Sequence, residues 1–322
     1  RLPFAVPVGV WPLQTAAPRN PRKIARKSTR EGLDVFSYLG ILFMRFLAKL
    51  PLSWVRGFAA LIGRVLFVLA APRRRVVEKN LLLCFPERTA KERRALARES
   101  FIYFCQAWLD RSWLWHAPRS VLEKRLKLHG AVQELEGTTP TIIFGPHFYG
   151  LDAAATAIGM STPRLFTSIY TPLPDKRLDA WITAGRVRFG DVKMFNRFDG
   201  IKNNLSGLRA GGILYLLPDM NFGPQESIFV PFYGIQAATV PSLPRFARLG
   251  KAKVVPVIPR MTPWGYDVEV HPAWQNYPSD DVEADTALMN ARLEGYINTM
   301  PSQYYWVHKR FKTRPTGEPS VY

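Results

Sequence analysis

The spacing of apolar and polar residues changes near residue 140. From there on, short runs rich in β-branched and aromatic residues alternate with stretches of helical period. The runs lie at 141–145, 165–170, 191–195, 212–217, 228–232, 253–258 and 266–271, and the helical stretches at 150–160, 176–189, 200–210, 241–249 and 282–299. This alternation predicts an α/β sheet covered by helices on both faces.

Residues 76–136 have a helical pattern. The stretch 87–115 has apolar residues on one side and charged residues on the other, and Thr89 followed by Glu92 predicts a capping box at its start. Residues 35–72 are strongly apolar, but cationic side chains interrupt them so often that the longest uncharged run has ten residues. A plain transmembrane helix needs about 20 apolar residues, so the pattern leaves the anchor type open.

Three interpretations of 35–72 compete. One is a single membrane span whose cationic side chains snorkel towards the interface. The second is a pair of amphipathic helices, broken near Pro51, that lie in the membrane interface. The third is a soluble helical hairpin packed on the domain. We expect membrane association, and the basic run "PRRR" at 72–75 suits an anionic leaflet.

Charge supports this expectation. The formal net charge is +19, and residues 1–80 hold 15 Lys and Arg against 3 Asp and Glu, which places +12 in the first quarter. Such asymmetry predicts an anionic partner, and the apolar sequence after residue 34 favours a membrane surface over nucleic acid. We expect a basic, proline-rich, disordered arm at 1–33, membrane-anchoring helices at 34–75 and a catalytic domain at 76–322.

The cysteine count argues against a zinc site. The two cysteines, Cys84 and Cys105, form no C-x-x-C pair, so we expect two buried thiols and no metal ligands.

The strongest candidate for chemistry is His147, in the stretch "TIIFGPHFYGLDAAATAIG" at 141–159. Its spacing to Asp152 is weak by itself, because His129 and Glu134 share it. The context is specific: a buried strand ends in Gly-Pro, and the carboxyl end of a strand in an open α/β sheet is where ligands bind. We expect His147 to lie on the turn before the helix and Asp152 to orient it, leaving one ring nitrogen free as a general base. The alternative is a histidine satisfied in the core.

The sequence contains no G-x-S-x-G nucleophile elbow. A His–Asp pair without a protein nucleophile indicates that the substrate supplies the nucleophile. A substrate hydroxyl that attacks an activated acyl group fits this pattern.

Six stretches of the chain are similar to a known protein family. The stretches "RRRVVEKNLLLCFPE" (73–87), "GPHFYGLD" (145–152), "AGRVRFG" (184–190), "LPDMNFGPQESIFVPFYG" (217–234), "VVPVIPR" (254–260) and "QYYWVHKRFKTRP" (303–315) resemble the bacterial lipid A biosynthesis acyltransferases. These are the lauroyl/myristoyl group of the H-x4-D/E glycerolipid acyltransferase superfamily. The resemblance runs from about residue 35 to the end, and it implies a central mixed sheet flanked by helices.

The resemblance also implies a reaction. His147 would deprotonate the hydroxyl of a 3-hydroxyacyl chain on a Kdo-bearing lipid A precursor, and Asp152 would orient it. The donor would be an acyl–acyl carrier protein, with no metal and no bound organic cofactor. The enzyme would lie at the bacterial inner membrane, in contact with phospholipid and facing the cytoplasm.

Further site residues follow from matching positions. Arg186 and Arg188 would hold an acceptor phosphate or help to stabilise an oxyanion. Asp219 would lie beside the site and orient an arginine or a substrate hydroxyl. Arg310 belongs to the basic stretch "HKRFKTR" (308–314), which would contact the carrier protein or lipid phosphates or be a solvated surface.

Two positions depart from the family. Asn221, which we also expect to contact substrate, stands where a second aspartate is usual, and Asp110 stands where the helix often carries a glutamate. Asn221 is the one sequence feature that supports an inactive lipid-binding relative. The other alternative is an acyltransferase for a different membrane lipid, such as a lysophospholipid, an aminolipid or a mannolipid.

Overall fold

The computed structural model describes residues 25–322, with side chains from residue 36 onward. Its α-helices are α1 (Ala25–Leu47), α2 (Leu52–Leu69), α3 (Ala71–Cys84), α4 (Ala90–His116), α5 (Arg119–Arg125), α6 (Leu151–Ser161), α7 (Lys176–Arg186), α8 (Lys202–Arg209), α9 (Ser242–Gly250) and α10 (Val282–Thr299). Its strands are β1 (Leu126–Gly130), β2 (Thr141–Phe144), β3 (Phe166–Tyr170), β4 (Val192–Asn196), β5 (Ile213–Leu216), β6 (Ile228–Phe232), β7 (Ile235–Thr239), β8 (Lys253–Thr262) and β9 (Gly265–Val270).

The central sheet is mixed, as the resemblance implied. Its seven strands run in the order β1-β9-β8-β2-β5-β3-β4, and β6 and β7 form a separate antiparallel pair. The pairs of β2 with β5 and β8, and of β3 with β4 and β5, are parallel, whereas β8 and β9 are antiparallel. Every residue of β2 is buried, which explains the apolar sequence Ile-Ile-Phe that follows Thr141.

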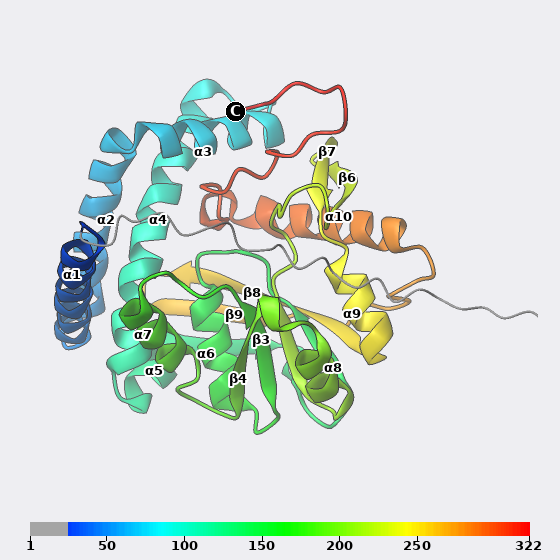
Figure 1. Cartoon of the computed structure of the whole chain (residues 1–322), viewed down its shortest axis with the longest axis horizontal. Coiled ribbons are helices and arrows are strands. Elements are labelled where there is room, and N and C mark those ends of the chain that lie inside the picture. The colour runs from blue at the N-terminus through cyan, green and yellow to red at the C-terminus, as the bar shows by residue number, and fades with distance from the viewer. Residues whose placement is uncertain (1–24) are drawn as a thin grey trace, which may run out of the picture.

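Helices cover both faces of this sheet, as predicted (Figure 1). Alternate side chains of β2 enter two different cores: Ile143 packs with residues of α5 and α6, whereas Ile142 and Phe144 pack with residues of α8, α9 and α10. The side chains alternate in this way because successive residues of a strand point to opposite faces of the sheet. The carboxyl ends of β2 and β5 therefore lie at an edge between two helical layers.

Most elements predicted from the sequence are present with shifts of a few residues at their ends. Thr89 caps α4, and Glu92 completes the capping box. Both cysteines are buried. Two strands, β1 and β7, have no counterpart among the predicted runs.

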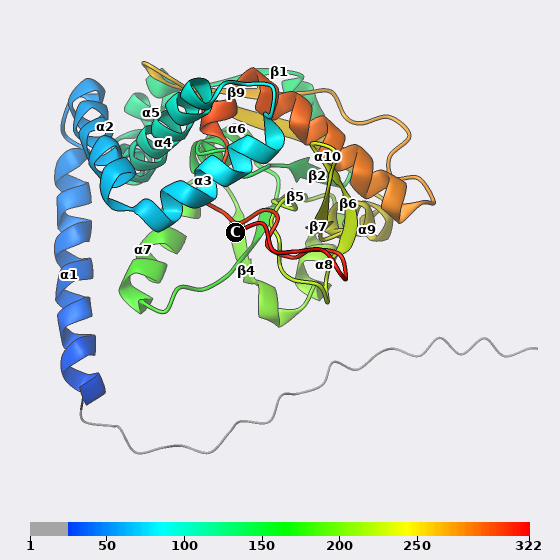
Figure 2. The same cartoon turned by 90° about the horizontal axis from the view of Figure 1, so that it is seen from above.

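The N-terminal helices form a separate layer beside α4 (Figures 1 and 2). The predicted break near Pro51 is present, since α1 ends at Leu47 and α2 begins at Leu52. Helix α1 begins at Ala25, inside the segment 1–33 that the sequence suggested as a disordered arm. The remainder of that segment, 1–24, lies outside the described residues.

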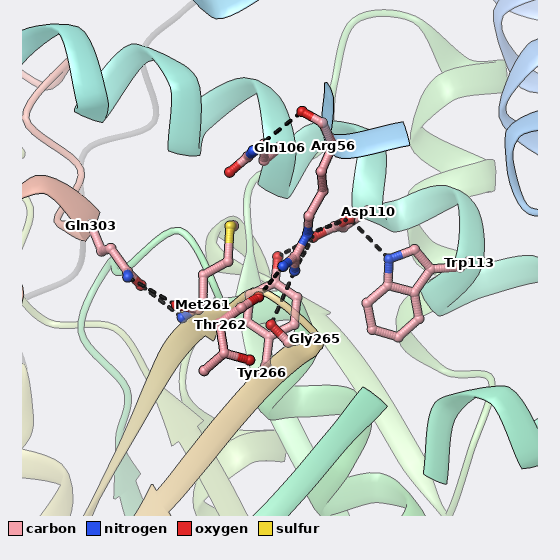
Figure 3. A network of polar contacts seen from close by, with 9 residues as sticks. All are labelled: Arg56, Gln106, Asp110, Trp113, Met261, Thr262, Gly265, Tyr266 and Gln303. Carbon is pink, nitrogen blue, oxygen red and sulfur yellow. Dashed lines mark hydrogen bonds and ion pairs between the residues drawn. The ribbon is translucent and has the colours of Figure 1, made fainter. Parts of the chain in front are cut away.

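A buried ion pair fixes α2 to the rest of the protein (Figure 3). The Nη2 atom of Arg56 lies 2.8 Å from the Oδ2 atom of Asp110 in α4, and the guanidinium also donates to the backbone carbonyls of Thr262 and Gly265. Asp110 accepts further hydrogen bonds from Trp113 and Tyr266. Asp110 therefore serves helix docking, and it does not line the cavity described below.

Candidate active site

A cavity of about 1370 Å³ opens at the carboxyl edge of the sheet, and His147 is part of its wall. One side of the wall comes from α4, α6 and α7. The other comes from α9 and from the loop between β5 and β6. The cavity thus crosses the sheet edge from one helical layer to the other, and most of its lining is apolar. Such a cavity is suited to a ligand with long hydrocarbon parts.

His147 lies on a turn, as predicted, between β2 and α6. The turn stays close to the next strand, because the Gly145 N–H donates to the Leu216 carbonyl at 3.0 Å. Any side chain at 145 would collide with Tyr215, whose ring lies 2.3 Å from the position of an added Cβ atom. The glycine therefore lets the chain turn directly at the end of β2.

The partner of His147 is Asp219, which follows the adjacent parallel strand β5. Its Oδ1 atom lies 2.6 Å from His147 Nδ1, and its Oδ2 atom accepts the His147 backbone N–H at 3.0 Å. The Tyr304 hydroxyl also donates to Oδ2, at 2.9 Å. Burial by itself raises the pKa of Asp219, but His147 and these donors outweigh it and hold the pKa at about 2. A charged, fixed carboxylate thus determines the ring orientation of His147.

A short C-terminal segment braces the turn. The Tyr149 N–H donates to the Gln303 carbonyl, and the Tyr305 N–H donates to the His147 carbonyl, both at 3.0 Å. The Gln303 side chain in turn bonds both the N–H and the carbonyl of Met261 in β8 (Figure 3). The turn that carries His147 is therefore fixed from both sides.

The prediction that Asp152 orients His147 is not what the structure shows. Asp152 lies in the first turn of α6, and its carboxylate bonds Arg111 at 2.7 Å and Arg186 at 2.9 Å. Burial raises the pKa of Asp152, but Arg186 and Arg111 outweigh this effect and lower the pKa to about 2. Asp152 and both arginines line the cavity. The carboxylate thus holds two guanidinium groups beside His147.

Two predicted substrate contacts have other roles in this structure. Arg188 donates to the carbonyls of Leu114 and Ala117, so it caps the end of α4. Arg310 is only 2% exposed and donates to the Ala238 carbonyl and the Thr239 hydroxyl. Neither side chain lines the cavity, so we correct both expectations: these arginines support the walls from behind.

Asn221 also has a structural role here. Its Nδ2 donates to the Arg310 carbonyl at 3.3 Å, while its Oδ1 accepts from the Gly223 N–H at 3.0 Å and the Thr313 hydroxyl at 2.9 Å. An aspartate could accept the last two bonds but could not donate the first. Asn221 therefore joins the β5–β6 loop to the C-terminal segment and does not line the cavity.

Sequence reasoning missed three side chains: Arg111, Tyr304 and His308. Arg111 stacks on Trp108, with its guanidinium carbon 4.0 Å from the ring centroid. Its signal was an arginine inside the aromatic stretch "WLDRSWLW" of α4, where a solvated charge is out of place. Tyr304 and His308 belong to the stretch 303–315, in which the basic side chains give the stronger signal.

This arrangement can perform proton transfer. Asp219 occupies Nδ1 of His147, and no described residue hydrogen-bonds Nε2, so Nε2 is available as a base on the cavity wall. The two arginines supply positive charge nearby. Among the described residues, no group of three or more His, Cys, Asp or Glu side chains could hold a metal ion.

Comparisons with known proteins agree with the resemblance. Residues 19–313 match the family model described as bacterial lipid A biosynthesis acyltransferase. A lipid A biosynthesis lauroyltransferase of Escherichia coli (strain K12) is 31% identical over 292 residues, covering 89% of this chain and 94% of that protein. A lipid A biosynthesis acyltransferase of Haemophilus influenzae is 32% identical, covering 87% and 89%. A lipid A biosynthesis myristoyltransferase of E. coli K12 is 30% identical, covering 89% and 90%.

The matched region includes every site residue described above and spans nearly the whole of each relative. The chain therefore belongs to the bacterial lipid A biosynthesis acyltransferase family and is an O-acyltransferase.

Proposed function

We propose that the enzyme transfers a fatty acyl chain from acyl–acyl carrier protein to the hydroxyl of a hydroxyacyl chain on a Kdo-bearing lipid A precursor. The observation that carries this proposal is the His147–Asp219 pair at the wall of a large, mostly apolar cavity. The family supplies the acceptor class, and the relatives' names include both lauroyl and myristoyl transfer.

The proposed step needs only side chains of this chain and the two substrates. His147 Nε2 takes the proton of the acceptor hydroxyl while the oxygen attacks the thioester carbonyl carbon. The tetrahedral intermediate collapses, the C–S bond breaks, and the leaving thiolate takes the proton from the imidazolium. Asp219 stabilises that imidazolium because its carboxylate is buried and already bonded to Nδ1. An ester and a free thiol result.

Arg111 and Arg186 are proposed to bind an anionic group of a substrate. Both side chains line the cavity, and the Nε–H group of each donates a hydrogen bond to the Asp152 carboxylate. Since a guanidinium carries five N–H donors, each arginine keeps others for a phosphate oxygen. This assignment extends the predicted role of Arg186 and adds Arg111. It gives Asp152 the task of positioning the two arginines.

We further propose that the enzyme lies on the cytoplasmic surface of the bacterial inner membrane. Helix α2 is long and apolar enough to cross a membrane, although a third of it is buried against the protein. The face of α1 and α2 turned away from α4 exposes large apolar side chains: Phe36, Leu39, Leu42, Phe43, Phe46, Trp54, Phe58, Leu61, Val65, Val68 and Leu69. This set is called the apolar face below.

The buried Arg56 favours an interfacial anchor over a single span. Its guanidinium bonds α4 and the β8–β9 turn, and buried side chains from Leu52 to Phe67 hold the rest of α2 against the protein. A helix held in this way inserts its free apolar face sideways into one leaflet. The basic residues of the first 80 positions would then contact anionic headgroups.

An acyl-transfer assay tests the proposed substrates. Detergent-solubilised enzyme is given a Kdo-bearing tetra-acylated lipid A precursor and carrier proteins loaded with C10 to C16 chains, and products are read by mass spectrometry. One added chain confirms the reaction and gives its length. If lysophospholipid, aminolipid or mannolipid acceptors react and the lipid A precursor does not, the acceptor is another membrane lipid. If no acceptor reacts with any of these donors, the proposed substrates are refuted.

A further inference from the structure

A second histidine, His308, lies on the wall of the same cavity as His147. Its backbone carbonyl accepts a hydrogen bond from the Asn80 side chain at 2.8 Å. Its ring Nε2 lies 3.1 Å from the backbone nitrogen of Asn221. Asn80 of α3 therefore holds the backbone at His308, and the β5–β6 loop holds its ring. The proposed reaction gives this ring no role so far.

The hydrogen bond from Asn221 determines where the ring proton lies. A backbone N–H can only donate, so Nε2 must be the acceptor, and a neutral His308 carries its proton on Nδ1. No described residue accepts a hydrogen bond from Nδ1. Burial is the main cause that lowers the pKa of His308 to about 4. The charges of Arg310, His147 and Arg73 lower this pKa further, whereas Asp219 raises it. The ring is thus neutral near pH 7, with one N–H donor unused at the cavity wall.

The two histidines have complementary roles. Asp219 bonds Nδ1 of His147 and leaves Nε2 to accept a proton, whereas Asn221 bonds Nε2 of His308 and leaves Nδ1–H to donate. Acyl transfer needs both, because a base must deprotonate the hydroxyl while a donor stabilises the carbonyl oxygen as it gains charge. A neutral ring with a single N–H suits one oxygen atom, whereas the paired guanidiniums of Arg111 and Arg186 suit a phosphate.

We propose that His308 is a catalytic residue whose Nδ1–H donates a hydrogen bond to the carbonyl oxygen of the acyl donor. This inference rests on the proposed function. When the hydroxyl attacks, the carbonyl π electrons move onto that oxygen, and they return when the thiolate leaves. The His308 proton stays on Nδ1 throughout. The residue thus supplies an oxyanion contact in the same cavity as the base.

Two substitutions separate this role from a purely structural one. In His308→Asn, the amide nitrogen can take the place of Nδ1, which keeps the donor to the cavity but loses the acceptor for the Asn221 N–H. In His308→Gln, the amide oxygen can take the place of Nε2, which keeps the bond to Asn221 but loses the donor. Thermal unfolding of both variants checks that each is folded before rates are compared.

We expect His308→Gln to lose about 10²-fold in kcat with little change in KM, since the lost contact forms only as charge develops. We expect His308→Asn to retain at least ten times the kcat of His308→Gln. If His308 only supports the loop, the order reverses: His308→Gln keeps activity and His308→Asn loses stability and rate together. That outcome overturns the proposal.

A second measurement does not depend on acyl transfer. The tautomer of His308 is read from the ¹⁵N chemical shifts of the full-length enzyme labelled at histidine, with His308→Gln used to assign the signal. We expect the neutral Nδ1–H form throughout pH 5.5 to 8. An Nε2–H form, or a ring that becomes charged within this range, contradicts the proposal. Because the wild type is assayed alongside, an inactive wild type with the expected tautomer points to a wrong substrate and not to a wrong assignment of the proton.

Discussion

At the scale of single residues, the two buried aspartates of the site have separate tasks. Asp219 bonds His147, and Asp152 bonds Arg111 and Arg186. Both carboxylates are almost inaccessible to solvent and both have a lowered pKa. The general base and the two arginines are therefore positioned independently, the base by Asp219 and the arginines by Asp152.

Replacing Asp152 with asparagine tests this division. The substitution leaves two partly buried guanidiniums without their shared anion, so we expect a loss of about 3 kcal/mol in the free energy of unfolding. We also expect KM for the anionic substrate to rise by a larger factor than kcat falls. The reason is that the general base His147 and its partner Asp219 are unchanged. Denaturant unfolding and steady-state kinetics measure the two effects.

Glu134→Gln is the matched control, since Glu134 pairs with Lys253 in a more exposed position. It should cost less than about 1 kcal/mol and leave kinetics unchanged. If Asp152→Asn instead abolishes kcat at unchanged KM, Asp152 acts on the base after all.

The same carboxylate predicts a pH dependence of stability. Because the folded pKa of Asp152 is lowered to about 2, its stabilising contribution is complete above the unfolded pKa of about 3.9 and is lost as the pH falls through the folded value. The stability difference between wild type and Asp152→Asn should therefore be largest near neutral pH and shrink below pH 4. Unfolding curves at several pH values measure it, and a difference that grows on acidification would refute the assignment.

How much of the site could be predicted from sequence depends on distance along the chain. His147 was identified because a buried strand ending in Gly-Pro determines its place. Its partner Asp219 is 72 positions away, and only the pairing of β2 with β5 brings the two together. Asp152 is close in sequence, but the first turn of α6 directs it to Arg111 and Arg186. A local spacing cannot reveal either fact.

At the scale of elements, the attachment of α2 to α4 depends on one buried ion pair. Asp110→Asn removes the negative charge and leaves Arg56 buried without an anion, so we expect a loss of about 3 to 5 kcal/mol. The double variant Arg56→Met with Asp110→Asn should recover part of that loss, because it removes the buried guanidinium that lost its anion, while the amide oxygen accepts from Trp113 and the amide NH2 can donate to the Tyr266 hydroxyl. Unfolding free energies of the wild type, both single variants and the double variant measure the coupling.

Glu123→Gln is the control, since Glu123 pairs with Arg119 at 2.8 Å in an exposed position of α5, away from α2. It should cost less than about 1 kcal/mol. Equal losses for Asp110→Asn and Glu123→Gln would mean that the buried pair does not fix α2.

Elements with a strong pattern were predicted well, and those without one were missed. The apolar run of β2 and the capping box of α4 left little ambiguity. Strand β1 follows α5 without a turn residue, and its sequence "LKLHG" mixes exposed and buried positions. Strand β7 follows β6 after a tight turn, so the two read as one irregular segment.

At the scale of the whole molecule, the sequence predicted a layered α/β body with a basic, apolar N-terminal region. It did not predict the sheet order or how the N-terminal helices dock, because both depend on contacts between distant segments. The structure shows α1 and α2 on one side of the body (Figure 2), with the apolar face turned outward.

This surface predicts how the enzyme binds membranes. Replacing Trp54, Phe58 and Leu61 with serine removes apolar side chains from the apolar face, so binding to vesicles containing anionic lipid should fall at least tenfold. Turnover of a detergent-dispersed substrate should be retained. Sedimentation with vesicles measures the binding, and Leu288→Ser, an exposed position on α10, is the control. Unchanged binding would place the membrane contact elsewhere.

The most direct test of the account is the transfer of one acyl chain to a Kdo-bearing lipid A precursor by wild type, His147→Ala and Asp219→Asn, followed by mass spectrometry. We predict product with the wild type, none above background with His147→Ala, and a rate lower by up to about 10⁴-fold with Asp219→Asn. Transfer by His147→Ala at the wild-type rate would contradict the account, because the proposed base would then have no part in the reaction.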